Sequence, residues 1–437
     1  MRAARVGVIT LLSGVIVLVA AVVLPGAVNG TQRQSPAPAQ LGEGHGSALE
    51  AGIRAAQNRL NNMPGDWDTW AQLGSAYVQL ARISADPSYY PRAEEALRRS
   101  LDLRAETNWQ AMVGMGALAN ARHDFRAAVD WGQRAAAVNS YGGSVHGVLA
   151  DALTQLGDYA GARDAIQRML DVQPGIASFA RASYHWELHG DNERARHALE
   201  AALADAADPS DVAFCRYYLG ELAFNRGDAN EALTQYQAAH DADPRYRLAR
   251  AGLAKAYAAL GRTDDALREY EATTAALPVP SILAEYGDLL TVLGRTSEAQ
   301  RQYDLVKAQH GLLAANGATD RITETLFLAD HGQPADAVAA AQAEWSARKN
   351  VEVADALAWA LHQAGRDAEA LPIADQAAGL GWRNATFSYH RATIRYALGD
   401  LAGARSDVAL AMSINPHFSV LYAPDAARLL AQLGGPP

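Results

Sequence analysis

Cysteine and lysine are scarce in this 437-residue chain. Cys215 is the only cysteine, which excludes an intrachain disulfide and a zinc site built from cysteines. Its neighbours, AFCRYYLG, indicate that it lies within a helix. Because free cysteine is among the most buried residue types, we expect Cys215 to be a small apolar core residue.

Clustered positive charge, which binding to a phosphate backbone requires, is also missing. The only lysines are Lys255, Lys307 and Lys349, and the formal net charge is −10. Nucleic acid is therefore not an expected partner.

Strand patterns and catalytic motifs are absent as well. No stretch alternates polar and apolar residues with the period of two that strands require, and Leu and Ala dominate, which favours an all-helical protein. There is no G-x-x-x-x-G-K-[ST] and no H-E-x-x-H, and GGSVHG (142–147) has His146 where a nucleophile elbow needs glycine. We therefore expect no enzyme activity, no cofactor and no small-molecule substrate.

The stretch YHWELHG (184–190) comes nearest to a metal motif. His185 and His189 are four residues apart and share one face of a helix. In a zinc peptidase, however, the glutamate directly follows the first histidine, whereas Glu187 is two residues on. No third zinc ligand is recognisable in the sequence. We interpret both histidines as packing residues near a helix C-terminus, with metal binding as the alternative.

The N-terminus carries a localisation signal. Arg2 and Arg5 precede an apolar stretch, and no charged residue occurs from position 6 to 32. This length favours an uncleaved signal anchor that crosses the membrane through residues 6-28, because signal peptides have shorter apolar regions. Cleavage near Val28-Asn29-Gly30, followed by secretion, is the alternative. The flanking positive charges place the N-terminus in the cytoplasm and the rest of the chain outside it.

Eight segments repeat the same short pattern, a glycine followed five residues later by alanine. The glycines are 33 to 38 residues apart, and the segments are GDYAGA (157–162), GDNERA (190–195), GDANEA (227–232), GRTDDA (261–266), GRTSEA (294–299), GQPADA (332–337), GRDAEA (365–370) and GDLAGA (399–404). Glycine can end one helix in the left-handed conformation, and the polar residue after it can cap the next. The pattern predicts an array of helical hairpins.

This pattern resembles the tetratricopeptide (TPR) repeat. In YYLGELAFNRGDANEALTQYQAAHDADP (217–244), Leu219-Gly220 match the pair in the first helix, Gly227 the turn, Ala232 the crossing alanine and Pro244 the closing proline. The stretch WAQLGSAYVQL (70–80) supplies another part of the signature. The resemblance implies an all-α TPR α-solenoid, a right-handed superhelix of about ten helical hairpins behind an N-terminal transmembrane or signal helix. The hairpins are expected to begin near residues 67, 109, 143, 176, 213, 247, 280, 318, 351 and 385.

The chain divides into six expected segments. They are a signal anchor or signal peptide (1-30), a flexible linker (31-46), an N-terminal capping helix (47-66), hairpins one to seven (67-317), hairpins eight to ten (318-417) and a C-terminal capping helix and tail (418-437). Capping helices are expected because each repeat buries its apolar face only against its neighbours. Hairpin eight has Thr325 at a glycine position of the pattern, so a break in curvature is expected there.

The resemblance further implies a concave groove lined by the first helix of each hairpin. At those positions stand two clusters of aromatic and polar side chains, which we take as candidate partner-binding residues. The first cluster is Tyr184, Glu187, Phe214, Tyr217, Glu221, Phe224 and Asn225, and the second is Glu352, Asp355, Trp359, His362, Tyr389 and Tyr396. Exposed rings with polar neighbours are typical of protein-binding surfaces, although each ring could instead pack internally.

These observations favour a non-catalytic scaffold for protein–protein interaction. The concave groove would bind a basic or neutral segment of a protein or peptide, outside the cytoplasmic membrane. The alternative is a structural spacer or self-association module of an envelope complex, without a ligand in the groove.

Overall fold

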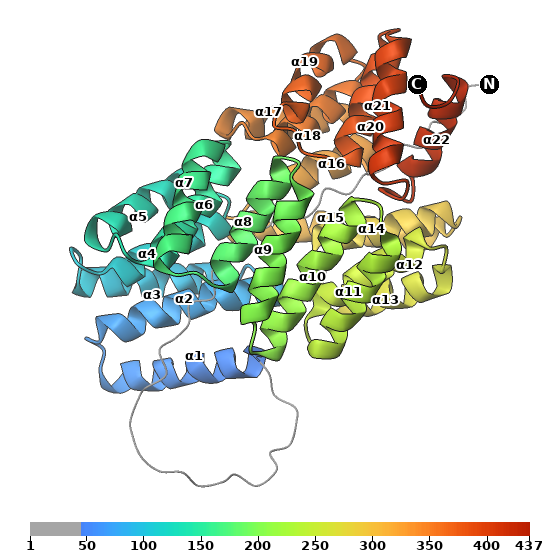
Figure 1. Cartoon of the computed structure of the whole chain (residues 1–437). Helices are drawn as coiled ribbons and strands as arrows, with labels where there is room; N and C mark the ends of the chain where they lie inside the picture. Colours follow the sequence, from blue (N-terminus) through green and yellow to red (C-terminus); the bar gives the residue numbers. More distant parts are fainter. Residues whose placement is uncertain (1–44) are drawn as a thin grey trace.

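The computed structural model describes residues 45–437, which form 22 α-helices and contain no β-strand. An all-α solenoid of helical hairpins is therefore confirmed for this part of the chain (Figure 1). The predicted signal anchor lies outside the described residues. Among the described helices, none has the length and apolar character to cross a membrane.

Ten hairpins, each made of a helix A and a helix B, follow one another between two single helices. The helices are α1 (His45–Asn62), α2 (Trp67–Ser84), α3 (Tyr89–Leu103), α4 (Trp109–Ala121), α5 (Phe125–Val138), α6 (Gly143–Leu156), α7 (Tyr159–Val172), α8 (Ile176–Leu188), α9 (Asn192–Asp205), α10 (Pro209–Asn225), α11 (Ala229–Ala242), α12 (Arg247–Ala259), α13 (Thr263–Ala276), α14 (Pro280–Val292), α15 (Thr296–Ala315), α16 (Arg321–His331), α17 (Pro334–Ala347), α18 (Val351–Gln363), α19 (Asp367–Ala378), α20 (Ala385–Ala397), α21 (Leu401–Ile414) and α22 (Tyr422–Gln432).

In every hairpin except the eighth, the turn contains one residue in the left-handed conformation, whereas Gly332 in hairpin eight has φ −114°. Gly157 and Gly227 have φ values of 82° and 88°, as the sequence pattern predicts. Asp158 then caps helix α7 by accepting a hydrogen bond from the Gly161 amide, and Asp228 caps α11 in the same way. Hairpin two lacks the glycine, and His123 adopts the left-handed conformation there with φ 62°.

Close packing between hairpins explains the glycines inside the A helices. The ring of Tyr236 on α11 is fully buried between α10 and α12. A Cβ atom at Gly220 or Gly252 would lie 2.5 or 2.4 Å from this ring. The small residue of the L-G pair therefore makes room for an aromatic ring. Cys215, on the same α10 helix, is fully buried as predicted, and this burial raises the pKa of its thiol to about 12.

The solenoid closes on itself along one edge. The turns of hairpins two to five lie against the connections that precede hairpins eight, nine and ten and helix α22. We call this contact the seam. It joins residues 121–124 to 316–320, residues 155–159 to 348–351, residues 187–190 to 381–383, and residues 224–227 to 414–416.

At the seam, the backbone of each turn lies very close to the backbone of the connection that it contacts. A Cβ atom at Gly157 would lie 2.3 Å from the Lys349 carbonyl oxygen, and one at Gly190 would lie 2.5 Å from the Gly381 carbonyl oxygen. Ala318, in the connection before α16, is buried in the apolar core of the first hairpins.

Asparagine side chains in the seam donate hydrogen bonds to carbonyl groups at helix ends. The Asn350 side-chain amide donates to the Gln155 carbonyl at the C-terminus of α6, at 2.9 Å. The Asn415 amide donates in the same way to the Phe224 carbonyl at the end of α10, at 2.8 Å. The last carbonyls of a helix have no partner within the helix, so the Asn350 bond satisfies Gln155. The Phe224 carbonyl, which already accepts from the Gly227 amide, gains a second donor. Helices α16–α22 consequently lie over the arc formed by α2–α15 (Figure 1).

Candidate partner-binding surface

The first predicted cluster lies mostly at the seam rather than on an open groove. Tyr184 is only 8% exposed, and its hydroxyl donates to the Glu352 carboxylate at 3.4 Å. Glu187, one turn further along α8, accepts a hydrogen bond from the Asn225 amide at 2.9 Å. The structure therefore brings members of the two predicted clusters together and makes them contact each other.

Glu221 and Phe224 of the first cluster are also engaged internally. The Lys255 ammonium lies 2.7 and 2.8 Å from the two oxygens of Glu221, and it lies 4.6 Å from the centre of the Phe224 ring. Phe224 is 6% exposed and carries the carbonyl that Asn415 binds. The expectation that Tyr184 and Phe224 are exposed is wrong, because the C-terminal hairpins cover them.

The second predicted cluster forms part of the C-terminal core. Trp359 is 2% exposed, donates from its indole N–H to Asp330 at 2.8 Å and stacks on His390 at 4.0 Å between ring centres. Asp355 is buried and lies 2.9 Å from the His390 ring nitrogen. Tyr389 is buried as well.

The prediction that Asp355, Trp359 and Tyr389 line an exposed groove is therefore wrong. Helix α22 and the neighbouring A helices enclose these side chains. His362, which is half-buried, forms a hydrogen bond through Nδ1 with the Asp367 carboxylate, and burial lowers the pKa of its imidazole. Tyr396 is 45% exposed, but it lies at the C-terminal end of α20, near the turn of hairpin ten.

Two carboxyl groups at the seam have raised pKa values. Burial raises the pKa of Glu352 and that of Glu187 to about 7, against an ordinary value of 4.5. The folded chain therefore holds these protons more firmly than the unfolded chain does. The stability that this difference contributes is fully present below about pH 4.5 and is lost as the pH rises through about 7.

We expect the melting temperature of the chain to fall between pH 5 and pH 8, and Glu352→Gln to make this fall shallower. Glutamine keeps an oxygen that accepts from Tyr184 but does not ionise. Thermal unfolding by circular dichroism at several pH values measures the effect, with the exposed Glu369→Gln as the control. An unchanged pH slope in Glu352→Gln would show that this carboxyl does not titrate at the seam.

Phe214 and Tyr217, the remaining members of the first predicted cluster, are half-buried and belong to a separate aromatic group. The tyrosine cluster, as we name it, consists of Phe214, Tyr217, Tyr218 and Tyr246 on and beside α10 and α12. Its ring centres are 4.7 Å apart for Phe214–Tyr218, 5.0 Å for Tyr217–Tyr218 and 5.7 Å for Tyr217–Tyr246. The sequence analysis missed Tyr218 and Tyr246, although both are tyrosines beside an expected groove position.

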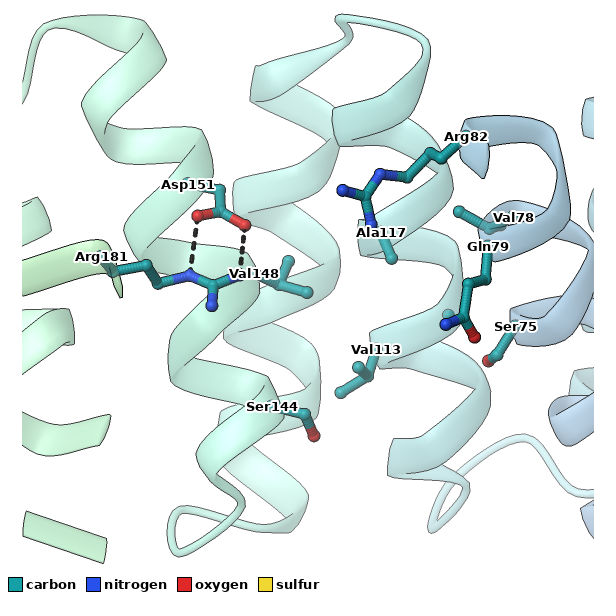
Figure 2. A pocket seen from close by; sticks show the side chains of 11 residues that line it. Ser75, Val78, Gln79, Arg82, Val113, Ala117, Ser144, Val148, Asp151 and Arg181 are labelled. Atoms are coloured by element: carbon teal, nitrogen blue, oxygen red, sulfur yellow. Dashed lines mark hydrogen bonds and ion pairs between the residues drawn. The ribbon is translucent and has the colours of Figure 1, made fainter. Parts of the chain in front are cut away.

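A hollow that the sequence analysis also missed lies on the A helices of hairpins one to four. This N-terminal pocket encloses about 490 Å³ when its open side is included. It is lined by Ser75, Val78, Gln79, Arg82, Val113, Gly114, Ala117, Ser144, Val148, Asp151 and Arg181 (Figure 2). Six of these eleven lining residues are polar or charged, and the other five, three of them valines, are small or apolar.

Two arginines give the N-terminal pocket its charge. Arg181 is 3% exposed and binds Asp151 through two hydrogen bonds of 2.7 and 2.8 Å, so this pair forms a fixed part of the wall. Arg82, from the opposite wall, extends its guanidinium towards the hollow (Figure 2). Its side chain retains solvent exposure, yet the surrounding protein lowers its pKa.

Arg82 of the N-terminal pocket also interacts with the tyrosine cluster. Burial raises the pKa of Tyr218 to about 12, and the positive charge of Arg82 opposes this increase. Arg82 also interacts electrostatically with Tyr246. Because such interactions require proximity, Arg82 on α2 lies near Tyr218 on α10 and Tyr246 beside α12.

The histidine pair of YHWELHG lies at the C-terminal end of α8. The ring centres of His185 and His189 are 4.3 Å apart, and Nδ1 of His189 lies 2.7 Å from the His185 carbonyl oxygen. Burial, assisted by the nearby His189, lowers the pKa of His185 to about 4. Within residues 45–437 no group of three or more His, Cys, Asp or Glu side chains is arranged to hold a metal ion.

Comparison with known families identifies tetratricopeptide repeats in the middle of the chain. One tetratricopeptide repeat model matches residues 223–284, and a second matches residues 148–211 and 179–247. No curated protein matches the sequence.

Three solved structures with a similar fold are distant in sequence. The Cut9–Hcn1 hetero-tetramer of the APC/C is 14% identical, with a TM-score of 0.44, and the match covers 89% of this chain and 83% of that one. Yeast Tom70 is 15% identical, with a TM-score of 0.39 and coverages of 88% and 86%. A tetratricopeptide repeat protein from Parabacteroides merdae is 20% identical, with a TM-score of 0.36 and coverages of 59% and 98%. The family matches and the observed hairpins together show that this chain carries tetratricopeptide repeats, within residues 148–284, in an all-α solenoid.

Proposed function

We propose that this chain is a non-catalytic scaffold that binds a segment of a partner protein on the inner surface of its first superhelical turn. Tetratricopeptide repeat proteins commonly mediate protein–protein interactions. The observation that carries the proposal is the N-terminal pocket, none of whose lining residues belongs to the seam and whose Arg82 lies near the tyrosine cluster.

The composition of this surface indicates the kind of segment that fits it. Val78, Val113 and Val148 offer an apolar floor for one aliphatic or aromatic side chain. The positive charge of Arg82 would attract a carbonyl or carboxylate oxygen of the segment, and the nearby tyrosines add rings with polar tips. This part of the groove is not acidic, so it favours a neutral segment over the basic alternative that the sequence also left open.

The proposal includes an extracytoplasmic location with the chain anchored through residues 6-28, supported by the uninterrupted apolar sequence behind Arg2 and Arg5. Resistance of the chain to extraction from membranes by alkaline carbonate, together with digestion of its repeats by protease added outside the cytoplasmic membrane, is the expected result. Complete release by carbonate, or full protease protection, would contradict it.

Affinity capture from membranes with the full chain as bait tests the binding site. Arg82→Ala is expected to reduce capture of a specific partner at least tenfold, because loss of one charged hydrogen bond costs about 1.5–3 kcal/mol. Arg99→Ala is the matched control, since Arg99 is exposed on the B helix α3. Equal capture by the two variants would exclude the inner surface of the first turn as the binding site.

A further inference from the structure

One turn sequence occurs twice in this chain in nearly identical form. LGDYAGAR (156–163) forms the turn of hairpin three, and LGDLAGAR (398–405) forms the turn of hairpin ten. The two stretches differ only at Tyr159 and Leu401. Both have a left-handed glycine and an aspartate cap, so they present the same backbone surface.

The first copy shows what this surface binds. The connection 349–351, which links two hairpins, lies directly on it in the seam. The Val351 amide donates to the Tyr159 hydroxyl at 3.0 Å, and the Lys349 carbonyl oxygen occupies the space above Gly157. The side-chain NH2 of Asn350 donates to the Gln155 carbonyl at the end of α6. The side-chain oxygen of Asn350 caps α18 by accepting from the Val353 amide.

The second copy is uncovered in the described part of the chain. A Cβ atom at Gly399 would meet nothing within 4 Å. The apolar side chains around Gly399 are exposed to solvent, and the exposed fraction is 45% for Tyr396, 43% for Leu398 and 52% for Leu401. Three exposed apolar side chains on one turn form a surface of the kind that a partner covers.

Turns in the seam and turns outside it, which we call open, differ in the residue that follows the turn glycine, with one exception. Gly157, Gly190 and Gly227, which lie in the seam, are each followed by aspartate. The open turns at Gly261, Gly294 and Gly365 are each followed by arginine instead. The exception is Gly399, which lies in an open turn but is followed by aspartate. By this pattern, the turn at Gly399 resembles the turns that another segment covers.

The seam also shows which edges remain available. The seam joins the turns of early hairpins to the connections between late hairpins. The turns that remain outside the seam therefore belong to late hairpins, and the connections that remain outside it lie between early hairpins. Among those early connections, 139–142 carries Tyr141, which is 83% exposed and is the most exposed of the large hydrophobic side chains in the described residues. It also carries Asn139, the C-cap of α5, whose side-chain oxygen accepts from the Tyr141 amide. In the same way, the side-chain oxygen of the seam residue Asn415, the C-cap of α21, accepts from the His417 amide.

We propose that the 139–142 connection of one copy of this chain docks on the 396–401 turn of a second copy. The contact would repeat the seam between molecules, with Tyr141 lying on Tyr396, Leu398 and Leu401. Because the two surfaces lie at opposite ends of the array, the association is head-to-tail and leaves one free surface of each kind.

Cross-linking between two differently labelled copies of the full chain tests this contact. One copy carries Tyr141→Cys and the other Leu401→Cys, and both are reconstituted in the same membranes and treated with a short bismaleimide. A mixed dimer is expected from the mixture, and little or none from either variant alone, since each variant then lacks one of the two thiols. The native Cys215 is buried and gives a constant background in all samples.

Leu293→Cys, at the open turn of hairpin seven, is the matched control. Leu293 is 40% exposed and follows α14 as Leu398 follows α20, but its turn carries arginine after the glycine. Tyr141→Cys mixed with Leu293→Cys is expected to give at least tenfold less mixed dimer. Absence of a mixed dimer in the first pair, equal yields in the two pairs, or cross-linking of Leu401→Cys only to another protein would each overturn the proposal. Unchanged helicity of the three variants shows that the comparison concerns folded chains.

Discussion

Replacing Trp359 by alanine is expected to lower the free energy of unfolding of the C-terminal hairpins by about 3–5 kcal/mol, the range for removing a buried tryptophan. The ring is 2% exposed, stacks on His390 and lies 5.4 Å from the Tyr422 ring of α22 between centres. Its indole N–H also satisfies Asp330, so the substitution leaves a cavity and removes a donor from a buried carboxylate.

Tyr396→Ala supplies the matched comparison, because Tyr396 was predicted in the same cluster but is 45% exposed. Its substitution is expected to change stability by no more than about 0.5 kcal/mol. Urea unfolding followed by circular dichroism, with hydrogen exchange to locate the affected hairpins, measures both. If the two variants lose equal stability, Trp359 is not the core residue that the structure describes.

The positions of the hairpins could be predicted because local chemistry determines them. The expected starts of the ten A helices lie within four residues of the observed ones, since a left-handed glycine ends one helix and a cap begins the next. Hairpin two shows the limit of this rule. His123 takes the left-handed conformation without glycine, which occurs for histidine more often than for most residues.

The exposure of the candidate site could not be predicted from the same pattern. The repeat register assigns Tyr184 to the concave side of its helix, but whether that side meets solvent depends on Glu352, 168 residues further on. Contacts at such separations follow from the curvature accumulated over six hairpins, which no single repeat specifies. A signal was nevertheless present, since glycine followed by aspartate distinguishes the seam turns from most of the open ones.

Gly157→Ala and Gly261→Ala are expected to differ strongly although the two glycines have similar backbone angles, with φ values of 82° and 72°. An alanine in the left-handed region is destabilised by about 1–2 kcal/mol at either position. At Gly261 nothing lies within 4 Å of the new Cβ atom, so we expect no loss of stability beyond this backbone term. At Gly157 the new atom would lie 2.3 Å from the Lys349 carbonyl oxygen, so the two edges of the seam must separate.

Separation at Gly157 would also break the bonds that Asn350 and Val351 make across the seam. Each buried polar group that loses its partner adds about 1–3 kcal/mol, so the total loss at Gly157 should exceed the loss at Gly261 by several kcal/mol. Hydrogen exchange at residues 348–351 and small-angle scattering of the full chain in detergent measure the opening directly. Faster exchange and a larger radius in Gly157→Ala alone are expected. Equal behaviour of the two variants would mean that the seam contributes little to the folded state, and that the central groove, with Tyr184 and Phe224, is accessible to a partner after all.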